Sequence, residues 1–506
     1  MLFVSAFGLL SCLLLGGGSR EGLLSDAILQ LVSVPVFLAA LWRILDAPLD
    51  RDRRRALIFC AAIVAVPLIQ LAPLPPAIWT RLPGRALLAE SFQLLGRAPS
   101  WAPISMTPEA TWLSALSLLP PLAIFLAVLT LGRRDRRRMS YAIIFFGVVS
   151  VFLGLIQLAQ GPTSPLRFYE TTNAGDPVGF FANRNHFAAL LYSSMLLAAA
   201  ALAPRLAALS PRPGTSRRGV DAWSAMGAEG AIAAGVAIVV LIAGEATARS
   251  RAGIILGAIA LFMCFVLGGE GRRFVEKITF PRALAAIVVL AVFLLGQAAV
   301  SRLLDRFDAD PLADARLVFA RNTITAAKSV TQIGAGLGSF PSFYMTFERP
   351  ADLQAGVYVN HAHNDFLELW LETGLGGPFL LAVFLIWLAR RAVVAWTAMD
   401  PGRLPVDRPL AQASILVILL LLGHSLVDYP LRAGAMMAVF AFCCGVLITP
   451  PAVSEPPRSR AGDPVRRRRE ARAANVDEEP ATLAHGAKAR KNFPGRSVFS
   501  DLAQGR

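Results

Sequence analysis

The sequence predicts an all-α polytopic membrane protein, and its composition carries that prediction. Hydrophobic residues make up 55% of the 506 residues and charged residues only 16%; the mean hydropathy is +0.56. A soluble protein needs a more polar surface than this composition supplies. The 5 cysteines all lie inside apolar segments without metal-ligand spacing. We therefore interpret them as small apolar core residues rather than as a metal site.

Long apolar runs supply the second observation. A window of about 20 residues, the length of helix that crosses a bilayer, finds about twelve spans. They lie near residues 2–18, 23–46, 56–74, 112–131, 140–160, 186–204, 228–246, 252–268, 282–300, 368–389, 409–425 and 432–449. No Lys or Arg precedes the first span and no small-residue cleavage site follows it. We expect a retained helix there rather than a signal peptide.

Basic residues follow every even-numbered span. They are Arg51, Arg53, Arg54 and Arg55; Arg133, Arg134, Arg136, Arg137 and Arg138; Arg212, Arg217 and Arg218; Arg272, Arg273 and Lys277; and Arg390 and Arg391. The positive-inside rule then predicts that these loops and both termini are cytoplasmic. Membrane orientation explains the net charge of +15 better than nucleic acid binding does.

This topology predicts three regions. Residues 1–178 are expected to form N-terminal transmembrane helices. Residues 179–449 are expected to form a core, with a large helical periplasmic loop at 301–367 between the ninth and tenth spans. The rest, 450–506, is rich in Arg, Pro, Glu, Ala and Ser and is expected to be a disordered basic cytoplasmic tail.

Unusual polar residues gather on the opposite, periplasmic side. His361-Ala-His-Asn-Asp365 places two of the 5 histidines one residue apart between apolar runs. Hydrocarbon penalises such groups unless they are paired or face water, and imidazole titrates near neutral pH. His424 and Asp428 flank the last turn on this side. The sequence therefore predicts chemistry at the outer membrane surface.

Several arginines on the same side break the positive-inside pattern. They are Arg184, Arg249, Arg251, Arg316 and Arg321. A single arginine near a helix end often reaches toward lipid headgroups, so the prediction depends on the whole set. Guanidinium groups match phosphate oxygens in a bidentate manner and stay charged. We expect Arg184, Arg251 and Arg316 to bind a lipid-linked diphosphate.

A histidine suits a separate task at such a site. When a sugar moves from a lipid diphosphate to an acceptor hydroxyl, that hydroxyl loses its proton, and an imidazole is a suitable base. Fixed arginines can stabilise the charge of the leaving group, so the reaction does not require a metal.

Short motifs in a characteristic order resemble the O-antigen ligase and polymerase superfamily. They are Gly179-Phe-Phe-Ala-Asn-Arg-Asn-His-Phe-Ala188, Thr247-Ala-Arg-Ser-Arg-Ala-Gly253, Arg316-Leu-Val-Phe319, Gly334-Ala-Gly-Leu-Gly-Ser-Phe340, His363-Asn-Asp-Phe-Leu367, Glu372-Thr-Gly-Leu-Gly376 and His424-Ser-Leu-Val-Asp-Tyr-Pro430. The resemblance covers residues 179–445. Its strength lies in the order of the motifs, since each motif alone is short.

The resemblance implies a metal-independent, inverting glycosyltransferase of the integral-membrane GT-C type, with no cofactor. The implied donor is an undecaprenyl-diphosphate-linked glycan, used at the periplasmic face of the bacterial inner membrane. The acceptor, whether lipid A core, growing polysaccharide or protein, stays open. By motif, Arg251 and Arg316 match family arginines, and His363 matches the histidine that we take as general base.

Neighbouring residues are expected to support these groups. We prefer His363 to His361 as the base and place His361, Asn364, Glu372, Arg249 and Arg321 around the site. Asn364 and Asp365 are expected to cap the following helix.

Glu368 and Glu372 lie four residues apart on that helix and share a face. They could orient His363 or bind acceptor hydroxyls, and an exposed pair is equally compatible with the spacing. The glycines at 334, 336 and 338 lack the Lys-Ser/Thr of a phosphate loop, so we expect a tight turn. The proline usual before this element is absent.

Two other classes compete with this interpretation. The His-Ala-His-Asn-Asp run resembles the start of a binuclear zinc motif, but Phe366 stands where a further histidine is required. A transporter or flippase for a lipid-linked saccharide predicts broken helices and charges near the bilayer midplane. Here the charges cluster at one interface, which favours surface chemistry.

Overall fold

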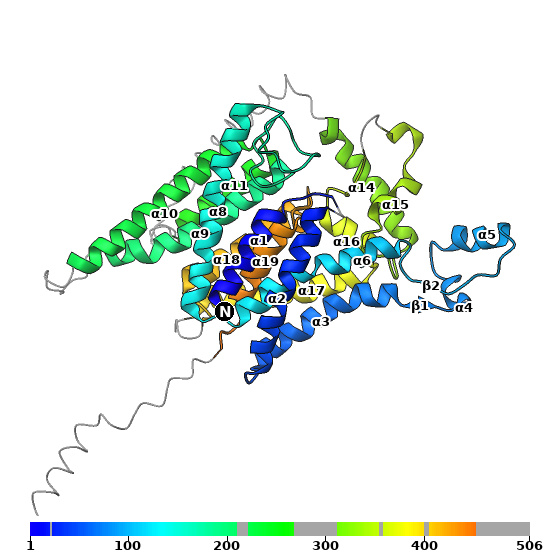
Figure 1. Cartoon of the computed structure of the whole chain (residues 1–506), viewed down its shortest axis with the longest axis horizontal. Helices are drawn as coiled ribbons and strands as arrows, with labels where there is room; N and C mark the ends of the chain where they lie inside the picture. Colours follow the sequence, from blue (N-terminus) through cyan, green and yellow to red (C-terminus); the bar gives the residue numbers. More distant parts are fainter. Residues whose placement is uncertain (21–22, 210–220, 268–310, 354–357, 399–403, 452–506) are drawn as a thin grey trace, which may run out of the picture. The chain divides into compact units, whose positions relative to one another are not determined.

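Helices make up most of the part of the chain that the structure describes. The computed structural model describes residues 1–20, 23–209, 221–267, 311–353, 358–398 and 404–451 (Figure 1). The first half of these ranges contains α1 (Leu2–Leu15), α2 (Leu24–Leu45), α3 (Arg51–Leu71), α4 (Pro76–Trp79), α5 (Ala86–Leu94), α6 (Pro108–Ser117), α7 (Leu119–Leu129) and α8 (Arg133–Gln160). The strands described are β1 (Pro73–Leu74) and β2 (Ala102–Pro103), which pair antiparallel.

The second half contains the helices that carry most of the predicted site. They are α9 (Arg184–Leu209), α10 (Asp221–Thr247), α11 (Arg251–Leu267), α14 (Pro311–Ser329), α15 (Phe340–Tyr344), α16 (Asp365–Thr373), α17 (Gly376–Thr397), α18 (Arg408–His424) and α19 (Gly434–Val446). Short 3₁₀ turns lie at Met345–Phe347, Pro350–Asp352 and Pro430–Arg432.

The predicted fold class, a mostly helical polytopic protein, is confirmed in outline. In the described ranges, 7 helical segments are long and apolar enough to cross a membrane, and four shorter apolar helices accompany them. The ninth predicted span, near 282–300, falls outside the described residues. The count of twelve spans and the periplasmic loop at 301–367 remain predictions.

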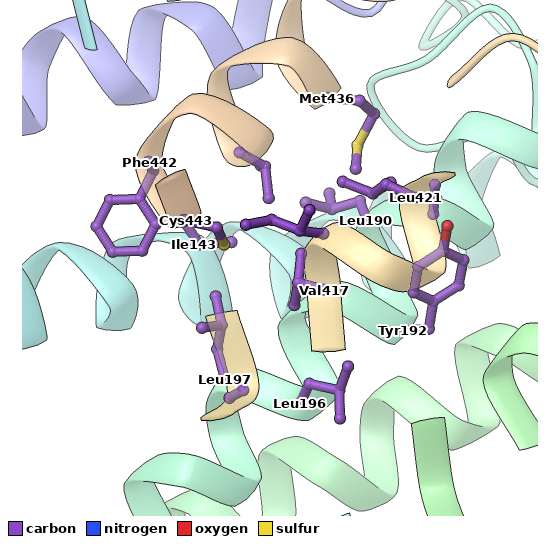
Figure 2. Close-up of a cluster of buried hydrophobic side chains, with 14 of the residues drawn as sticks. Ile143, Leu190, Tyr192, Leu196, Leu197, Val417, Leu421, Met436, Phe442 and Cys443 are labelled. Carbon is purple, nitrogen blue, oxygen red and sulfur yellow. The ribbon is translucent and has the colours of Figure 1, made fainter. Parts of the chain in front are cut away.

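The core of the bundle is built around α9, which is the most deeply buried of the candidate spans. Figure 2 shows side chains converging from four helices: Ile143 of α8; Leu190, Tyr192, Leu196 and Leu197 of α9; Val417 and Leu421 of α18; and Met436, Phe442 and Cys443 of α19. Small residues on α9, including Ala188, Ala189 and Ala198, let neighbouring helices approach closely. All 5 cysteines are free, and Cys12, Cys443 and Cys444 are buried as core residues.

Predicted basic loops meet at one end of the bundle, which we call the basic end. Asp52, in the first turn of α3, binds Arg391 of α17 and accepts a hydrogen bond from Thr449 Oγ1 at 2.9 Å. Arg137 of α8 pairs with Asp407 at 2.7 Å. The buried Arg136 donates to the Ile448 carbonyl oxygen at 2.5 Å, just beyond the last residue of α19. The basic loops at 212–218 and 272–277 lie outside the described residues.

The predicted tenth span begins later than expected. Residues 365–373 form the separate helix α16, and the long apolar helix α17 starts only at Gly376. Gly374 ends α16 with φ 59°, a conformation that favours glycine. A Cβ at this position would lie 2.6 Å from the Ile333 backbone nitrogen. This close approach is a tertiary contact, which hydropathy along the chain does not reveal.

Candidate functional site

His363 lies directly before α16, in a backbone conformation that the surrounding structure must enforce. Asn364 caps the helix, accepting hydrogen bonds from the Phe366 and Leu367 N–H groups at 3.1 and 3.0 Å. His363 itself has φ 49°. Among the described residues only His363 and Arg249 are non-glycine residues with positive φ. Such conformations cost on the order of 1–3 kcal/mol and concentrate at functional sites.

The strained backbone accompanies a specific pairing of His363 with Asp428. His363 Nδ1 lies 3.0 Å from Asp428 Oδ1, and the second carboxylate oxygen accepts a hydrogen bond from the Asn185 side chain. Burial raises the pKa of Asp428, but the hydrogen bond and charge of His363 outweigh burial and hold that pKa well below its ordinary value. An ionised Asp428 only accepts hydrogen bonds, so Nδ1 of His363 carries a proton, and in the neutral form of the ring the lone pair is then on Nε2.

His361 lies in a different electrostatic setting. Its Nδ1 is 2.8 Å from Glu368 Oε1, and Glu368 Oε2 accepts the Ala362 N–H at 2.8 Å. Burial lowers the pKa of His361, but the charge of Glu368 and its hydrogen bond give a net rise. His361 is therefore biased toward its protonated form, which has no lone pair to accept another proton. The preference for His363 over His361 as the base stays a prediction.

The three acidic residues of α16 surround an arginine that the sequence interpretation did not single out. Arg432 Nη1 lies 2.9 Å from Glu372 Oε2 and 3.4 Å from Glu368 Oε1, and Arg432 Nε lies 3.5 Å from Asp365 Oδ1. Glu368 thus orients His361 rather than His363. The charge of Arg432 offsets the cost of burying these carboxylates.

Asp365 does not cap α16, contrary to our expectation; Asn364 does, as expected. The Asp365 carboxylate instead accepts a hydrogen bond from Ser425 Oγ at 2.6 Å. Burial raises the pKa of Asp365 to about 6, although Arg432 and Ser425 oppose the rise. Asp365 therefore joins α16 to the turn that carries Asp428.

The three glycines after α14 form a turn against α16. Gly334, Gly336 and Gly338 have φ of 77°, 111° and 75°. The Gly338 N–H donates to Glu372 Oε1 at 2.9 Å, and the Gly336 N–H donates to the Glu372 carbonyl oxygen at 2.9 Å. The glycine element is a packing turn, as expected, and it secures Glu372.

Tyr429 lies at the centre of a histidine cluster that the sequence did not reveal. Its ring centroid is 4.3 Å from that of His361, 4.9 Å from His363 and 5.0 Å from His186. His424 Nδ1 contacts Tyr192 Oη at 3.1 Å. Four of the 5 histidines therefore gather around the Asp428–Tyr429 turn, and His485 lies outside the described residues. The signal for this turn was the polar motif His424–Pro430.

Two of the predicted arginines share a carboxylate. Arg184 Nη1 lies 2.7 Å from Asp176 Oδ2, and Arg249 Nη1 lies 3.3 Å from Asp176 Oδ1. Arg167 Nη1 donates to the Asp176 carbonyl oxygen at 2.9 Å. Sequence reasoning missed both Asp176 and Arg167, because they lie in the irregular segment between α8 and α9.

The remaining predicted arginines are Arg251, Arg316 and Arg321, and they lie in different surroundings. Arg316 lies on α14 within electrostatic range of His424, and Phe319, one turn later, has its ring 6.1 Å from that of His363. Arg251 opens α11. Arg321 instead points to Asp352, with both carboxylate oxygens 2.9 Å from its Nη2, so the structure does not bring Arg321 to the histidines.

The two histidines of the zinc-like motif diverge, because each directs its Nδ1 to a different carboxylate. Across the ranges that the structure describes, no group of three or more His, Cys, Asp or Glu side chains is arranged to hold a metal ion.

Comparison with known proteins identifies the central part of the chain. Residues 236–382 match the family model described as O-antigen ligase. The matched range includes Arg251, Arg316 and His363, whereas Asp428, Tyr429 and Arg432 follow it. No curated protein matches the chain.

Proposed function

Because this chain is an O-antigen ligase/polymerase family protein, we propose that it transfers an undecaprenyl-diphosphate-linked glycan to an acceptor hydroxyl. The reaction takes place at the periplasmic face of the bacterial inner membrane, inverts the anomeric centre and uses neither metal nor cofactor. One observation carries the proposal: His363 Nδ1 lies 3.0 Å from Asp428 Oδ1, a pairing that would leave Nε2 of a neutral His363 to act as the base.

The reaction needs one proton transfer and one displacement. The acceptor oxygen attacks the anomeric carbon from the side opposite the diphosphate, while His363 Nε2 removes the hydroxyl proton. The anomeric C–O bond breaks, and its electron pair leaves with the diphosphate. Asp428 stabilises the imidazolium that forms, as a carboxylate does in a catalytic triad.

Arginines are suited to hold the leaving group. Arg184 and Arg249 converge on the carboxylate of Asp176, which supports a role for these arginines in holding an anion. Together with Arg251 and Arg316, they would stabilise the growing charge on the diphosphate in a partly dehydrated site. Arg321, which pairs with Asp352, is left out of this role.

The basic end of the bundle indicates which side of the membrane the proposed site faces. Arg137 and Arg391 lie there with Asp407 and Asp52, and the positive-inside rule assigns that end to the cytoplasm. α18 runs from Arg408, next to Asp407, to His424 in the histidine cluster. This supports placing the cluster at the opposite end of the bundle, the site end, which we assign to the periplasm. We retain residues 1–178, 179–449 and 450–506 as the proposed regions.

A matched pair of variants tests the proposal. The full chain, reconstituted in vesicles with a lipid-diphosphate oligosaccharide and candidate acceptors, is compared with His363→Ala and His361→Ala. We expect His363→Ala to abolish transfer and to leave membrane insertion intact, while His361→Ala retains measurable transfer. Full transfer by His363→Ala would show that the base is assigned wrongly. Movement of the donor across the membrane without transfer would indicate a flippase, an alternative that the family match does not support.

A second experiment, done in cells, would identify the acceptor. A deletion strain is examined for the lipopolysaccharide ladder, secreted polysaccharide and glycoprotein together. Loss of the ladder while repeat polymer is still made indicates a ligase, and products with one repeat unit indicate a polymerase.

A further inference from the structure

The segment between α3 and α6 carries an apolar surface that the proposed chemistry does not use. Residues 72–107 leave α3, pass through β1, α4, α5 and β2, and return to α6 (Figure 1). The two strands pair Pro73 with Pro103 and Leu74 with Ala102, which closes the base of the excursion. We call residues 72–107 the β1–β2 excursion.

Helix α5 presents a row of leucines outward. Leu87, Leu88 and Leu94 of α5 are 72%, 38% and 82% exposed, and Leu95, directly after the helix, is 69% exposed. At 3.6 residues per helical turn, positions 87, 88, 94 and 95 point in similar directions, so the four leucines share one face. No residue of α5 is buried, and Phe92 on another face packs against Trp79 with ring centroids 6.0 Å apart. The leucine face is therefore an apolar stripe without a protein partner in the described part of the chain.

The surroundings of this stripe match a membrane surface. Trp101 and Ile78, also in the excursion, are 65% and 50% exposed, and tryptophan concentrates at the boundary between headgroups and acyl chains. Arg81 and Arg97 are exposed on either side of α5, whose acidic residue is Glu90. An apolar face flanked by cations is typical of helices that lie in the interface of anionic membranes.

The excursion connects two candidate membrane spans, which agrees with a position at the membrane surface. It begins where the candidate span α3 ends, at Leu71, and it ends where the next candidate span starts, at Pro108. Both connections therefore lie at a membrane boundary. We propose that α5 lies in the headgroup layer at the site end of the bundle, with its leucine face directed into the acyl chains.

Contact of α5 with the membrane would also set the depth of the catalytic residues relative to the lipid headgroups. This consequence depends on the proposed function. The Met106 N–H donates to the Ala335 carbonyl oxygen at 2.8 Å, and Thr111 Oγ1 donates to the Leu337 carbonyl oxygen at 2.7 Å. Gln70 Nε2 donates to the Glu372 carbonyl oxygen at 2.8 Å. Met106 and the two helices that flank the excursion are thus bonded to the glycine turn and to α16, beside the proposed site for a lipid diphosphate.

Two adjacent positions on α5 test the proposal. Leu94→Cys places a fluorescent label on the leucine face, and Gln93→Cys places the same label on the opposite, exposed face of the same turn. The full chain is reconstituted in vesicles of phosphatidylethanolamine and phosphatidylglycerol, and the signal of the labelled parent chain is subtracted. Quenching by nitroxide lipids is then compared with quenching by aqueous iodide.

We expect the label at position 94 to emit at shorter wavelength, to be quenched by nitroxide lipids and to be protected from iodide. The label at position 93 should show the reverse pattern. Equal quenching of both labels by iodide would overturn the proposal. Protection of position 94 from both quenchers would also overturn it, because the leucine face would then be covered by protein, such as a second copy. These readouts need no transferase activity, so they are independent of the proposed function.

Discussion

The two ends of the helical bundle both hold arginines and carboxylates, but their charges have different roles. At the basic end, Arg136 binds carbonyl oxygens near the ends of helices, and Arg137 binds a single carboxylate. At the site end, Asp428 and Tyr429 bring together histidines from several segments. Charges at the basic end join helices, whereas charges at the site end set the protonation state of their neighbours.

Backbone conformation separates the two ends as well. The described non-glycine residues with positive φ, Arg249 and His363, both belong to the site end. At the same end, both ring nitrogens of the buried His186 have no hydrogen-bond partner in the described ranges. Both strained residues therefore lie at the end that holds the histidines, and backbone strain of this kind concentrates at functional sites.

The largest expected effect concerns Asp428. Asp428→Asn removes the anion that holds the proton on His363 Nδ1, so the imidazole can take the unproductive tautomer. We expect the transfer rate to fall about 100- to 10,000-fold, the usual range for loss of an oriented base. Initial rates in vesicles measure this effect, with thermal unfolding as a control for folding. A rate within twofold of the parent rate would contradict the role of Asp428.

Arg432→Met is expected to lower stability strongly. The substitution leaves Asp365, Glu368 and Glu372 close together without their cation. Removing one partner from a buried charge cluster costs about 3–5 kcal/mol. Thermal unfolding in detergent should show a large fall in Tm, which the double variant Arg432→Met/Glu372→Gln should partly restore. An unchanged Tm in Arg432→Met would show that the cluster is not coupled to folding.

The raised pKa of Asp365 should make stability depend on pH, with an effect of intermediate size. Burial raises the pKa of its carboxyl from 3.8 to about 6, so the folded state binds this proton more tightly than the unfolded state does. The resulting stabilisation is complete below about pH 3.8 and is lost as the pH rises through about 6. Asp365→Asn removes this contribution. The change in Tm between pH 5 and pH 7 should therefore differ between variant and parent; identical changes would argue against the raised pKa.

Arg137→Ala at the basic end should have the smallest effect. Its side chain is 43% exposed in the pair with Asp407, and surface ion pairs contribute about 0–1 kcal/mol. We expect a small change in Tm and an unchanged transfer rate, in contrast to Arg432→Met. A loss of transfer as large as that in Asp428→Asn would remove the distinction between the two ends.

The sequence predicted the parts of this molecule that depend on local pattern. Apolar runs indicated the helices, and the clustered basic residues indicated loops that meet at one end. The His361–Asp365 motif led to the site because polar residues stand out in an apolar chain.

What the sequence could not supply were partners distant along the chain. Asp428 lies 65 residues from His363, and Asp176 lies 73 residues from Arg249. No periodicity relates such positions. The break at Gly374 also depends on a tertiary approach of residues 332–333. Hydropathy alone therefore extended the tenth span through α16.

The state of the His363 ring tests the central claim most directly. In the full chain labelled with ¹⁵N-histidine and held in lipid, the His363 signals are identified by their loss in His363→Ala. At the pH of maximal transfer, we expect a proton on Nδ1 and none on Nε2, and a shift of the proton toward Nε2 in Asp428→Asn. A proton on Nε2 in the parent protein would contradict the role of His363, because that nitrogen could not then act as the base.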